Sequence, residues 1–254
     1  MTKRPIGAVT FDLWDCLFVD DSDEPKRAAA GLPPKRVTRR RLAHEYLARH
    51  APIARKAVDL AYDVTDAAFR KVWDDQHVTW TVRERLGVLL AGLKRELPEG
   101  ELSELVKLHE EMELGHRPDP APGALDALKV LHGKYPLVIV SDAIFSPGRC
   151  LRELLSGAGM LEWFDHFIFS DEIGVSKPAR GMFDAAARAA GCDVTALVHV
   201  GDRPHNDIDG PHAVGARGVL LTVVKDRSSA KSKPDAVCDD YGKLPGIIAG
   251  LGAR

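Results

Sequence analysis

The sequence predicts an α/β protein, with a Rossmann-like three-layer core, a mainly parallel sheet and an inserted α-helical cap domain. In the second half of the chain, short apolar runs alternate with segments of helical periodicity, in the order strand, helix, strand, helix, strand. This alternation is typical of a doubly wound sheet. After the first apolar run, residues 19–117 show helical periodicity alone, which predicts a separate helical unit.

Five mostly apolar runs, bounded by polar residues or glycine, are the predicted strands. They are AVTF before Asp12, LVIV before Ser141, FIF before Ser170, ALVHV before Gly201 and GVLLTVV at 218–224. Runs that lack an alternating polar face are expected in strands covered on both sides. They therefore favour a parallel sheet with helices on both faces.

Three helices are predicted around these strands, over residues 122–133, 146–159 and 178–191. In the second of them, Ser146 is expected at the N-cap and Pro147 at the first helical position. A serine hydroxyl accepts a bond from a free amide of the first turn, and proline has no amide to leave unpaired there.

Residues 1–18 and 118–254 are expected to form the core domain, and residues 19–117 a cap of four helices. We expect residues 20–41 to be the outgoing linker and the proline-rich segment HRPDPAPG at 116–123 to be the return linker. Linkers of this kind would allow the cap to move as a unit.

Three periodic apolar stripes predict the helices of the cap. They are Ile53-Ala57-Leu60-Val64-Ala68, then Val82-Leu86-Leu89-Leu90-Leu93-Leu97, then Leu102-Leu105-Leu108-Met112. Thr81 and Glu84 form a capping box at the start of the second. Among the aromatic residues of the cap, Trp80, with Arg83 beside it, is the expected substrate contact.

Charge and hydropathy exclude several classes of partner. The chain has 35 Lys and Arg against 37 Asp and Glu, a net charge of -2, so no nucleic acid is expected to bind. The basic run KRVTRRR at 35–41 is expected to be a solvated helix start beside the acidic run DDSDE at 20–24. No apolar run reaches the roughly 18 residues of a membrane span. We expect a cytoplasmic protein without a signal peptide; the residues carry no indication of its oligomeric state.

Polar residues that could bind a ligand or take part in a reaction follow the predicted strands. They are Asp12 after the first, Ser141 and Asp142 after the second, Ser170, Asp171 and then Lys177 after the third, and Asp202 and Asp207 after the fourth. In open parallel sheets, ligands bind beyond the carboxyl ends of the strands. We therefore expect these carboxylates, a hydroxyl and a lysine to meet at one edge of the sheet.

This set of groups favours phosphoryl transfer. Converging carboxylates with few other ligands suit a hard cation such as Mg²⁺. A carboxylate that attacks a phosphate meets a repulsion of about 4 kcal/mol per unit charge pair, at about 4 Å and an effective dielectric near 20. Mg²⁺ and Lys177 would remove much of this repulsion. The site therefore indicates a reaction through an aspartyl-phosphate.

Four segments, FDLWDCLF, VIVSDA, SDEIGVSKP and VHVGDRPHNDIDG, resemble in sequence and order the motifs of the haloacid dehalogenase (HAD)-like hydrolases, in the subfamily I branch with a helical, C1-type cap. The resemblance implies that Asp12 is the nucleophile, that Ser141 bonds the phosphoryl group, that Lys177 steadies both and that Asp207 is a supporting acid. It implies Mg²⁺ as cofactor, with Asp12, the backbone carbonyl of Trp14 and Asp202 as ligands. It also implies substrate contacts from Trp14, Asp142 and Lys177, and a small phosphorylated metabolite as substrate.

One position departs from the family pattern. Phosphatases of this family usually carry a second Asp two residues after the nucleophile, where it protonates the leaving group; here that residue is Trp14. Loss of a general acid typically costs 10²- to 10⁴-fold, or roughly 3 to 5.5 kcal/mol. We expect slow hydrolysis of alkyl phosphates, or a preference for acyl or aryl phosphates. Asp15 is the nearest carboxylate that could substitute, and Cys16 is expected to be a small packed residue.

Two alternatives remain open at the level of sequence. True 2-haloacid dehalogenases carry an aromatic residue at the position of Trp14, and in that chemistry Asp12 would attack carbon and expel halide. Those enzymes lack the counterpart of Asp202, which this chain has. The second alternative is a degenerate protein that binds a phosphorylated ligand or a partner without turnover.

Overall fold

A computed structural model of the chain describes residues 5–228 and 231–252. Its described part contains a six-stranded sheet in the order β3-β2-β1-β4-β5-β6, in which all neighbouring strands are parallel. The strands are β1 (Ala8–Phe11), β2 (Leu137–Ser141), β3 (His166–Phe169), β4 (Leu197–Gly201), β5 (Arg217–Leu221) and β6 (Ala236–Cys238). The predicted α/β fold with a parallel sheet is confirmed.

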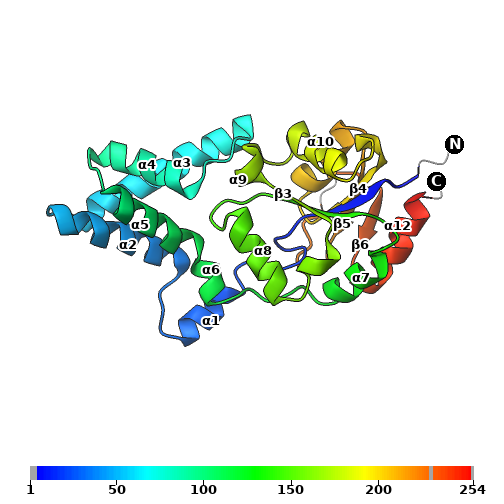
Figure 1. The fold of residues 1–254 in the computed structure, drawn as a ribbon, viewed down its shortest axis with the longest axis horizontal. Helices are drawn as coiled ribbons and strands as arrows, with labels where there is room; N and C mark the ends of the chain where they lie inside the picture. Colours follow the sequence, from blue (N-terminus) through cyan, green and yellow to red (C-terminus); the bar gives the residue numbers. More distant parts are fainter. Residues whose placement is uncertain (1–4, 229–230, 253–254) are drawn as a thin grey trace.

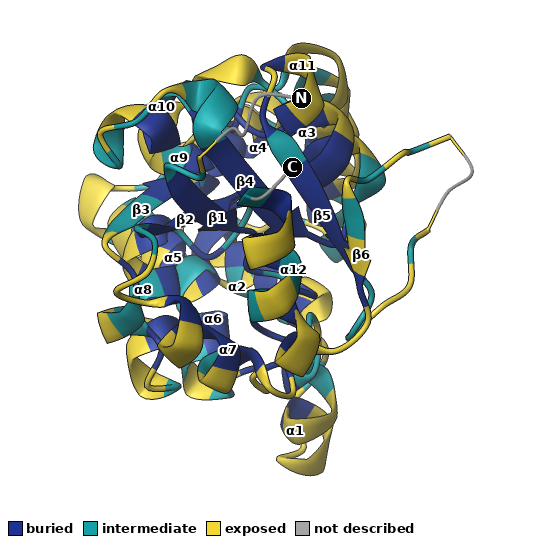
Figure 2. Ribbon diagram, turned by 90° about the vertical axis from the view of Figure 1, so that its right-hand side faces the viewer, coloured by how far each residue is buried: buried dark blue, intermediate teal, exposed yellow. Residues whose placement is uncertain are grey.

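Helices cover both faces of this sheet, so its central strands β1, β2 and β4 are buried on both sides (Figure 2). On β1, Val9 and Phe11 point into one apolar cluster and Ala8 into the other. The first cluster includes residues of α7 (Ala124–Leu131), α8 (Gly148–Gly157) and α12 (Leu244–Gly252), and the second includes residues of α10 (Arg180–Ala189). This double burial explains why the strand sequences lack an alternating polar face.

Shorter helices complete the core. They are α9 (Ser170–Ile173), α11 (Gly210–Ala213) and the turns Leu161–Trp163, Val194–Ala196, Pro204–Asp209 and Tyr241–Lys243.

The fifth strand is shorter than predicted, and the sixth strand was not predicted. β5 ends at Leu221, not at residue 224, and the next residue, Thr222, donates its amide to the carbonyl of Cys238 at the end of β6. β6 has three residues and its Val237 is 52% exposed. So short an edge strand leaves no apolar run to detect.

The start of α8 also differs from the prediction. Pro147, not Ser146, occupies the N-cap position, so the N-cap side chain makes no hydrogen bond to the first turn. The Ser146 hydroxyl instead donates to the carbonyl of Glu110, 3.2 Å away, and to the Glu113 carboxylate. The hydroxyl is therefore used to join this loop to the inserted helices.

The helices that lie between β1 and α7 in the chain are placed beyond the carboxyl end of the sheet (Figure 1). They are α1 (Asp23–Ala29), α2 (Lys35–His50), α3 (Arg55–Gln76), α4 (Val82–Leu93), α5 (Glu99–Glu110) and α6 (Met112–Gly115). They have an apolar cluster of their own, to which α2, α3, α4 and α5 contribute. We refer to α1 to α6 with their connections as the cap. The capping box of Thr81 and Glu84 at the start of α4 is confirmed.

Two predictions for the cap were wrong. Residues 20–41 do not form a plain linker, because α1 and the first seven residues of α2 lie within them. On α3, Leu60 and Val64 are 65% and 61% exposed, and the buried face carries Val58, Tyr62 and Phe69. Aromatic residues one or two positions away from the aliphatic stripe decided which face packs, because their larger area gains more from burial.

The basic run does begin a helix, but only part of it is solvated. Lys35, Arg39 and Arg40 are each less than a tenth exposed. Lys35 Nζ lies 2.7 Å from Asp23 Oδ1, and Arg40 Nη2 lies 2.7 Å from Asp63 Oδ1. Ion pairs within the cap thus allow two of these cations to be buried.

No helix in the described ranges is both long and apolar enough to cross a bilayer.

Candidate active site

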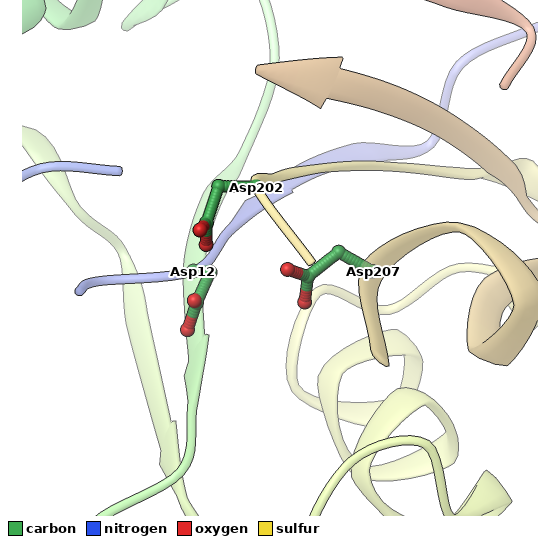
Figure 3. Close-up of side chains that lie close together, drawn as sticks. All are labelled: Asp12, Asp202 and Asp207. Atoms are coloured by element: carbon green, nitrogen blue, oxygen red, sulfur yellow. The ribbon is translucent and has the colours of Figure 1, made fainter. Parts of the chain in front are cut away.

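Asp12 directly follows the central strand β1 and lies at the carboxyl edge of the sheet. Its amide donates to the carbonyl of Val200 on β4, at 2.9 Å, which extends the ladder by one residue and fixes the backbone there. Its carboxylate lies near those of Asp202 and Asp207, with one oxygen from each within 4.8 Å of the others (Figure 3). All three residues are buried.

Lys177 supplies the positive charge that this cluster requires. Its Nζ lies 2.8 Å from Asp12 Oδ1 and 2.7 Å from Asp207 Oδ1, and the residue is 2% exposed. Burial lowers the pKa of Lys177, but the charges of Asp12 and Asp207 outweigh burial and hold that pKa above its ordinary value. The side chain is therefore an ammonium ion in direct contact with Asp12.

Asp207 is held by residues that the sequence analysis did not single out. His199 Nε2 lies 3.1 Å from Asp207 Oδ1, and His199 Nδ1 lies 2.7 Å from the hydroxyl of Thr10. Burial lowers the pKa of His199, so the ring is neutral. A neutral ring that donates from Nε2 to a carboxylate must accept from Thr10 at Nδ1. The only signal in the sequence was a polar residue in each of two apolar strands.

Burial would raise the pKa of Asp207, but the charge of Lys177 and the bond from His199 hold it well below its ordinary value. The amide of Arg203 donates to the second oxygen, Oδ2, at 2.8 Å. Both oxygens of Asp207 thus have protein partners. This carboxylate serves chiefly to position Lys177.

Asp142 and Ser141 stand at the end of β2. Asp142 accepts the amide of Lys177 at 2.9 Å and the side-chain amide of Asn206 at 3.1 Å, and burial raises its pKa to about 6. Asp142 therefore holds the backbone that presents Lys177. The Ser141 hydroxyl is buried and has no hydrogen-bond partner among the described residues, so it is available to a ligand.

Ser170 and Asp171, which follow the third predicted strand, support the backbone and do not belong to the carboxylate cluster. The Ser170 hydroxyl accepts the amide of Ala143 at 2.9 Å, and Asp171 accepts the amide of Gly148 at 3.1 Å. These side chains hold the loop that follows β2. Only Lys177, further along the same segment, reaches the carboxylate cluster.

Asp202 has the character of a cation ligand. It is fully buried, and its Oδ1 has no hydrogen-bond partner in the described part of the chain. The guanidinium of Arg227, which also lies 2.7 Å from Asp15 Oδ2, forms an ion pair with it. A buried carboxylate without hydrogen bonds needs a positive charge beside it. The oxygen donors of Asp12 and Asp202 fit a hard divalent cation such as Mg²⁺.

Trp14 lies where a second Asp would be in the family pattern, and its side chain lines a cavity of about 460 Å³ in front of Asp12. Asp15 is not available as a substitute acid, because its carboxylate accepts the amide of Asp20 at 3.0 Å and pairs with Arg227. Cys16 is fully buried and burial raises its thiol pKa, so the prediction of a packed residue is confirmed.

The cap forms the other wall of this cavity. Asp12, Asp142 and Lys177 line it from the core, and Lys35 and Arg39 line it from the cap. Hydrogen bonds join the two parts next to Lys177: the loop between α3 and α4 exchanges backbone bonds with the segment 174–176, at 2.8 and 3.3 Å.

The expected contact from Trp80 and Arg83 is not found. Arg83 donates to Ser103 at 2.7 Å and pairs with Glu99 at 3.0 Å, and neither Trp80 nor Arg83 lines a cavity described here. Trp80 lies against Phe69, with ring centroids 6.0 Å apart. Trp80 thus packs within the cap, and Arg83 forms an exposed ion pair there.

The chain belongs to the haloacid dehalogenase-like hydrolases, since the model of that family matches residues 6–215. Pyrimidine 5'-nucleotidase YjjG of Escherichia coli is 35% identical over 92 residues, which are 36% of this chain and 40% of that protein. Phosphoserine phosphatase of Thermus thermophilus is 28% identical over 142 residues, 50% of this chain and 55% of that protein. The chain thus spans about half the length of these curated relatives.

The crystal structure of a 2-haloacid dehalogenase from Pseudomonas syringae is similar with a TM-score of 0.65 and 23% identity. The match covers 96% of this chain and 99% of that chain. At this identity the likeness shows the shared fold, with its helical insertion, and not a shared substrate.

Proposed function

We propose that this protein is a Mg²⁺-dependent phosphatase that acts on a small phosphorylated metabolite through an aspartyl-phosphate at Asp12. The observation that carries the proposal is the buried arrangement of Asp12, Lys177 and Asp202. A carboxylate touches an ammonium ion at 2.8 Å, beside a second, fully buried carboxylate whose Oδ1 has no hydrogen-bond partner among the described residues. Such a site is suited to hold a nucleophile next to a phosphate and a divalent cation.

In the first step, a carboxylate oxygen of Asp12 attacks phosphorus, and the bond from phosphorus to the leaving oxygen breaks with its electron pair on oxygen. Lys177 and the unpartnered hydroxyl of Ser141 hold the phosphoryl oxygens. Asp12 and Asp202, with the backbone carbonyl of Trp14, would hold Mg²⁺. When bound, Mg²⁺ supplies positive charge that offsets the repulsion between Asp12 and the phosphate.

In the second step, water attacks the phosphorus of the aspartyl-phosphate, which releases inorganic phosphate and restores the Asp12 carboxylate. The leaving oxygen of the first step must also gain a proton. Trp14 cannot donate one, and Asp15 is held by Asp20 and Arg227. We therefore expect faster turnover of acyl and aryl phosphates, whose leaving groups need no proton, than of alkyl phosphates.

In this proposal, residues 1–18 and 118–254 act as the catalytic core and residues 19–117 as the cap that selects the substrate. The support is the cavity in front of Asp12, which both parts line. Closing of the cap would exclude water from the aspartyl-phosphate until the leaving group has departed.

The test is phosphate release from acetyl phosphate, p-nitrophenyl phosphate and alkyl phosphates, with Mg²⁺ and with excess EDTA. Wild type and the Asp12→Asn variant are compared, with Asp239→Asn as the control, because Asp239 is exposed and pairs only with Lys243 among the described residues. We expect release that requires Mg²⁺ and is lost in Asp12→Asn alone.

Two outcomes would overturn the proposal. Release of chloride from 2-chloropropionate in EDTA, without release of phosphate, would assign the site to dehalogenation. Release of neither product, together with Mg²⁺-dependent binding of a phosphate mimic such as vanadate, would assign it to binding without turnover.

A further inference from the structure

A second cavity, of about 660 Å³, adjoins the one in front of Asp12. Arg39, Arg70, Ile144, Phe145 and Arg203 line both cavities, so the two spaces share a boundary. The second cavity is strongly basic, because six arginines line it against a single carboxylate, Asp66. Its size is in the range that holds a small organic ligand.

Half of these arginines are paired with two carboxylates of the cap. Arg36 and Arg40 pair with Asp63, at 3.2 and 2.7 Å, and Arg85 pairs with Asp66 at 2.7 Å.

The other three, Arg39, Arg70 and Arg203, have no ion pair and donate no side-chain hydrogen bond within the described ranges. All three belong to the boundary between the cavities. The unpaired positive charge is thus gathered at the place where a ligand would pass from one cavity to the other.

Arg39 is the most informative of the three. It is 6% exposed, its guanidinium lies 3.7 Å from the centroid of the Phe145 ring, and its Nε has no hydrogen-bond partner among the described residues. Burial lowers its pKa to about 10. The acid that most raises that pKa is Glu113, which is already bonded to Lys35 and Ser146.

A buried guanidinium without a carboxylate beside it destabilises the ligand-free protein. An anion that binds to the guanidinium offsets much of this free-energy cost. Arg39 lies on α2, in the basic run of the sequence, but it is buried and lines the two cavities. A buried cation that lines a cavity can be reached by a small anionic group, whereas a nucleic acid backbone requires exposed cations.

We propose that Arg39, with Arg70 and Arg203, binds a second anionic group of the substrate, a carboxylate or a phosphate. The inference rests on the proposed function and narrows it: the substrate is a phosphate monoester with a further anion at its other end. The loop that carries Ile144 and Phe145 follows Ser141 and Asp142 directly, so one short molecule can lie along it with an anion at each end.

The experiment measures binding and so does not depend on turnover. Propylphosphonate has one anionic group, and 1,3-propanebisphosphonate and 4-phosphonobutyrate have two; none of them has a phosphate ester bond to hydrolyse. Their affinities for wild type, Arg39→Met and Arg70→Met are measured by titration calorimetry at one ionic strength with Mg²⁺. Arg41→Met is the matched control, since Arg41 lies on the same helix and pairs with Glu45 away from both cavities.

We expect wild type to bind at least one of the two doubly anionic probes at least tenfold more tightly than propylphosphonate. Arg39→Met should lose this preference, and Arg70→Met should lose part of it. The affinity of these variants for propylphosphonate, and the affinities of the Arg41→Met control for all three probes, should change less than threefold. The better of the two probes then distinguishes a phosphate from a carboxylate. Because Arg39→Met removes a buried unpaired charge, its thermal unfolding midpoint should not fall, which separates lost binding from lost folding.

The proposal is overturned if wild type shows no preference for a second anion, or if Arg39→Met weakens propylphosphonate as much as the other probes. The latter would place Arg39 in the first phosphate site. Failure of the proposed phosphatase function would give a different result. No phosphate ester would be hydrolysed, but wild type would still prefer probes with two anionic groups, and Arg39→Met would still lose that preference.

Discussion

Lys177 Nζ lies 2.8 Å from Asp12 Oδ1 in a pocket where both side chains are less than a tenth exposed. Three further groups fix this contact: Asp207 bonds the same ammonium at 2.7 Å, His199 bonds Asp207, and Asp142 bonds the amide of Lys177. The position of the charge beside Asp12 is therefore determined by the core of the protein before any ligand binds.

Replacing Lys177 with Met should lower phosphate release from acetyl phosphate by at least about 10²-fold, as expected when a fixed charge on the transferring group is lost. It leaves Asp12 and Asp207 buried without their cation, so the free energy of unfolding should also fall, by about 3 kcal/mol or more. Steady-state kinetics and urea unfolding measure the two effects. Lys243→Met, at an exposed ion pair, is the control and should change neither. An active Lys177→Met protein would show that the ammonium is not needed.

Trp14→Asp should raise the rate with alkyl phosphates by about 10²-fold and leave the rate with acetyl phosphate nearly unchanged, because only the alkoxide leaving group needs a proton. Trp14→Phe is the control, since it changes the size of the side chain without adding an acid. Rates with both substrates are compared for the three proteins. If Trp14→Asp leaves the alkyl phosphate rate at the wild-type level, another residue already acts as the acid.

Gly201→Ala should disturb the active site indirectly, by displacing Asp207. Gly201 ends β4, and a β-carbon there would overlap the carboxylate of Asp207. Moving Asp207 would displace Lys177, so activity should fall more than tenfold and the free energy of unfolding by about 2 kcal/mol. Gly250→Ala, in α12 with open space around its α-carbon, is the matched control and should keep full activity. Wild-type kinetics for Gly201→Ala would contradict the positioning role of Asp207.

The sequence predicted the candidate site better than it predicted the cap, for a physical reason. The carboxyl ends of neighbouring parallel strands must meet at one edge, so Asp12 and Asp202 could be placed together from strand order alone. No local rule of this kind decides which face of α2 or α3 packs inward. Arg39 is buried because of its contact with Phe145, more than a hundred residues away in sequence. The link between His199 and Thr10 is likewise a contact between different strands.

Stability of the cap should depend on pH through His109 on α5. Its Nδ1 donates to the carbonyl of Leu105 at 2.8 Å, so Nε2 accepts the hydroxyl of Tyr62 at 2.7 Å. Burial, with the charge of Arg39, lowers the His109 pKa from 6.5 to about 3. Below pH 6.5 the unfolded chain therefore binds a proton that the folded chain does not, and stability falls as pH drops from 6.5 towards 3, by about 2 kcal/mol at pH 5. Thermal unfolding at pH 7 and pH 5 should show a smaller loss for His109→Gln than for wild type, whereas a variant of the exposed His132, His132→Gln, should behave as wild type does. An equal loss in wild type and His109→Gln would mean that His109 is protonated in the folded cap.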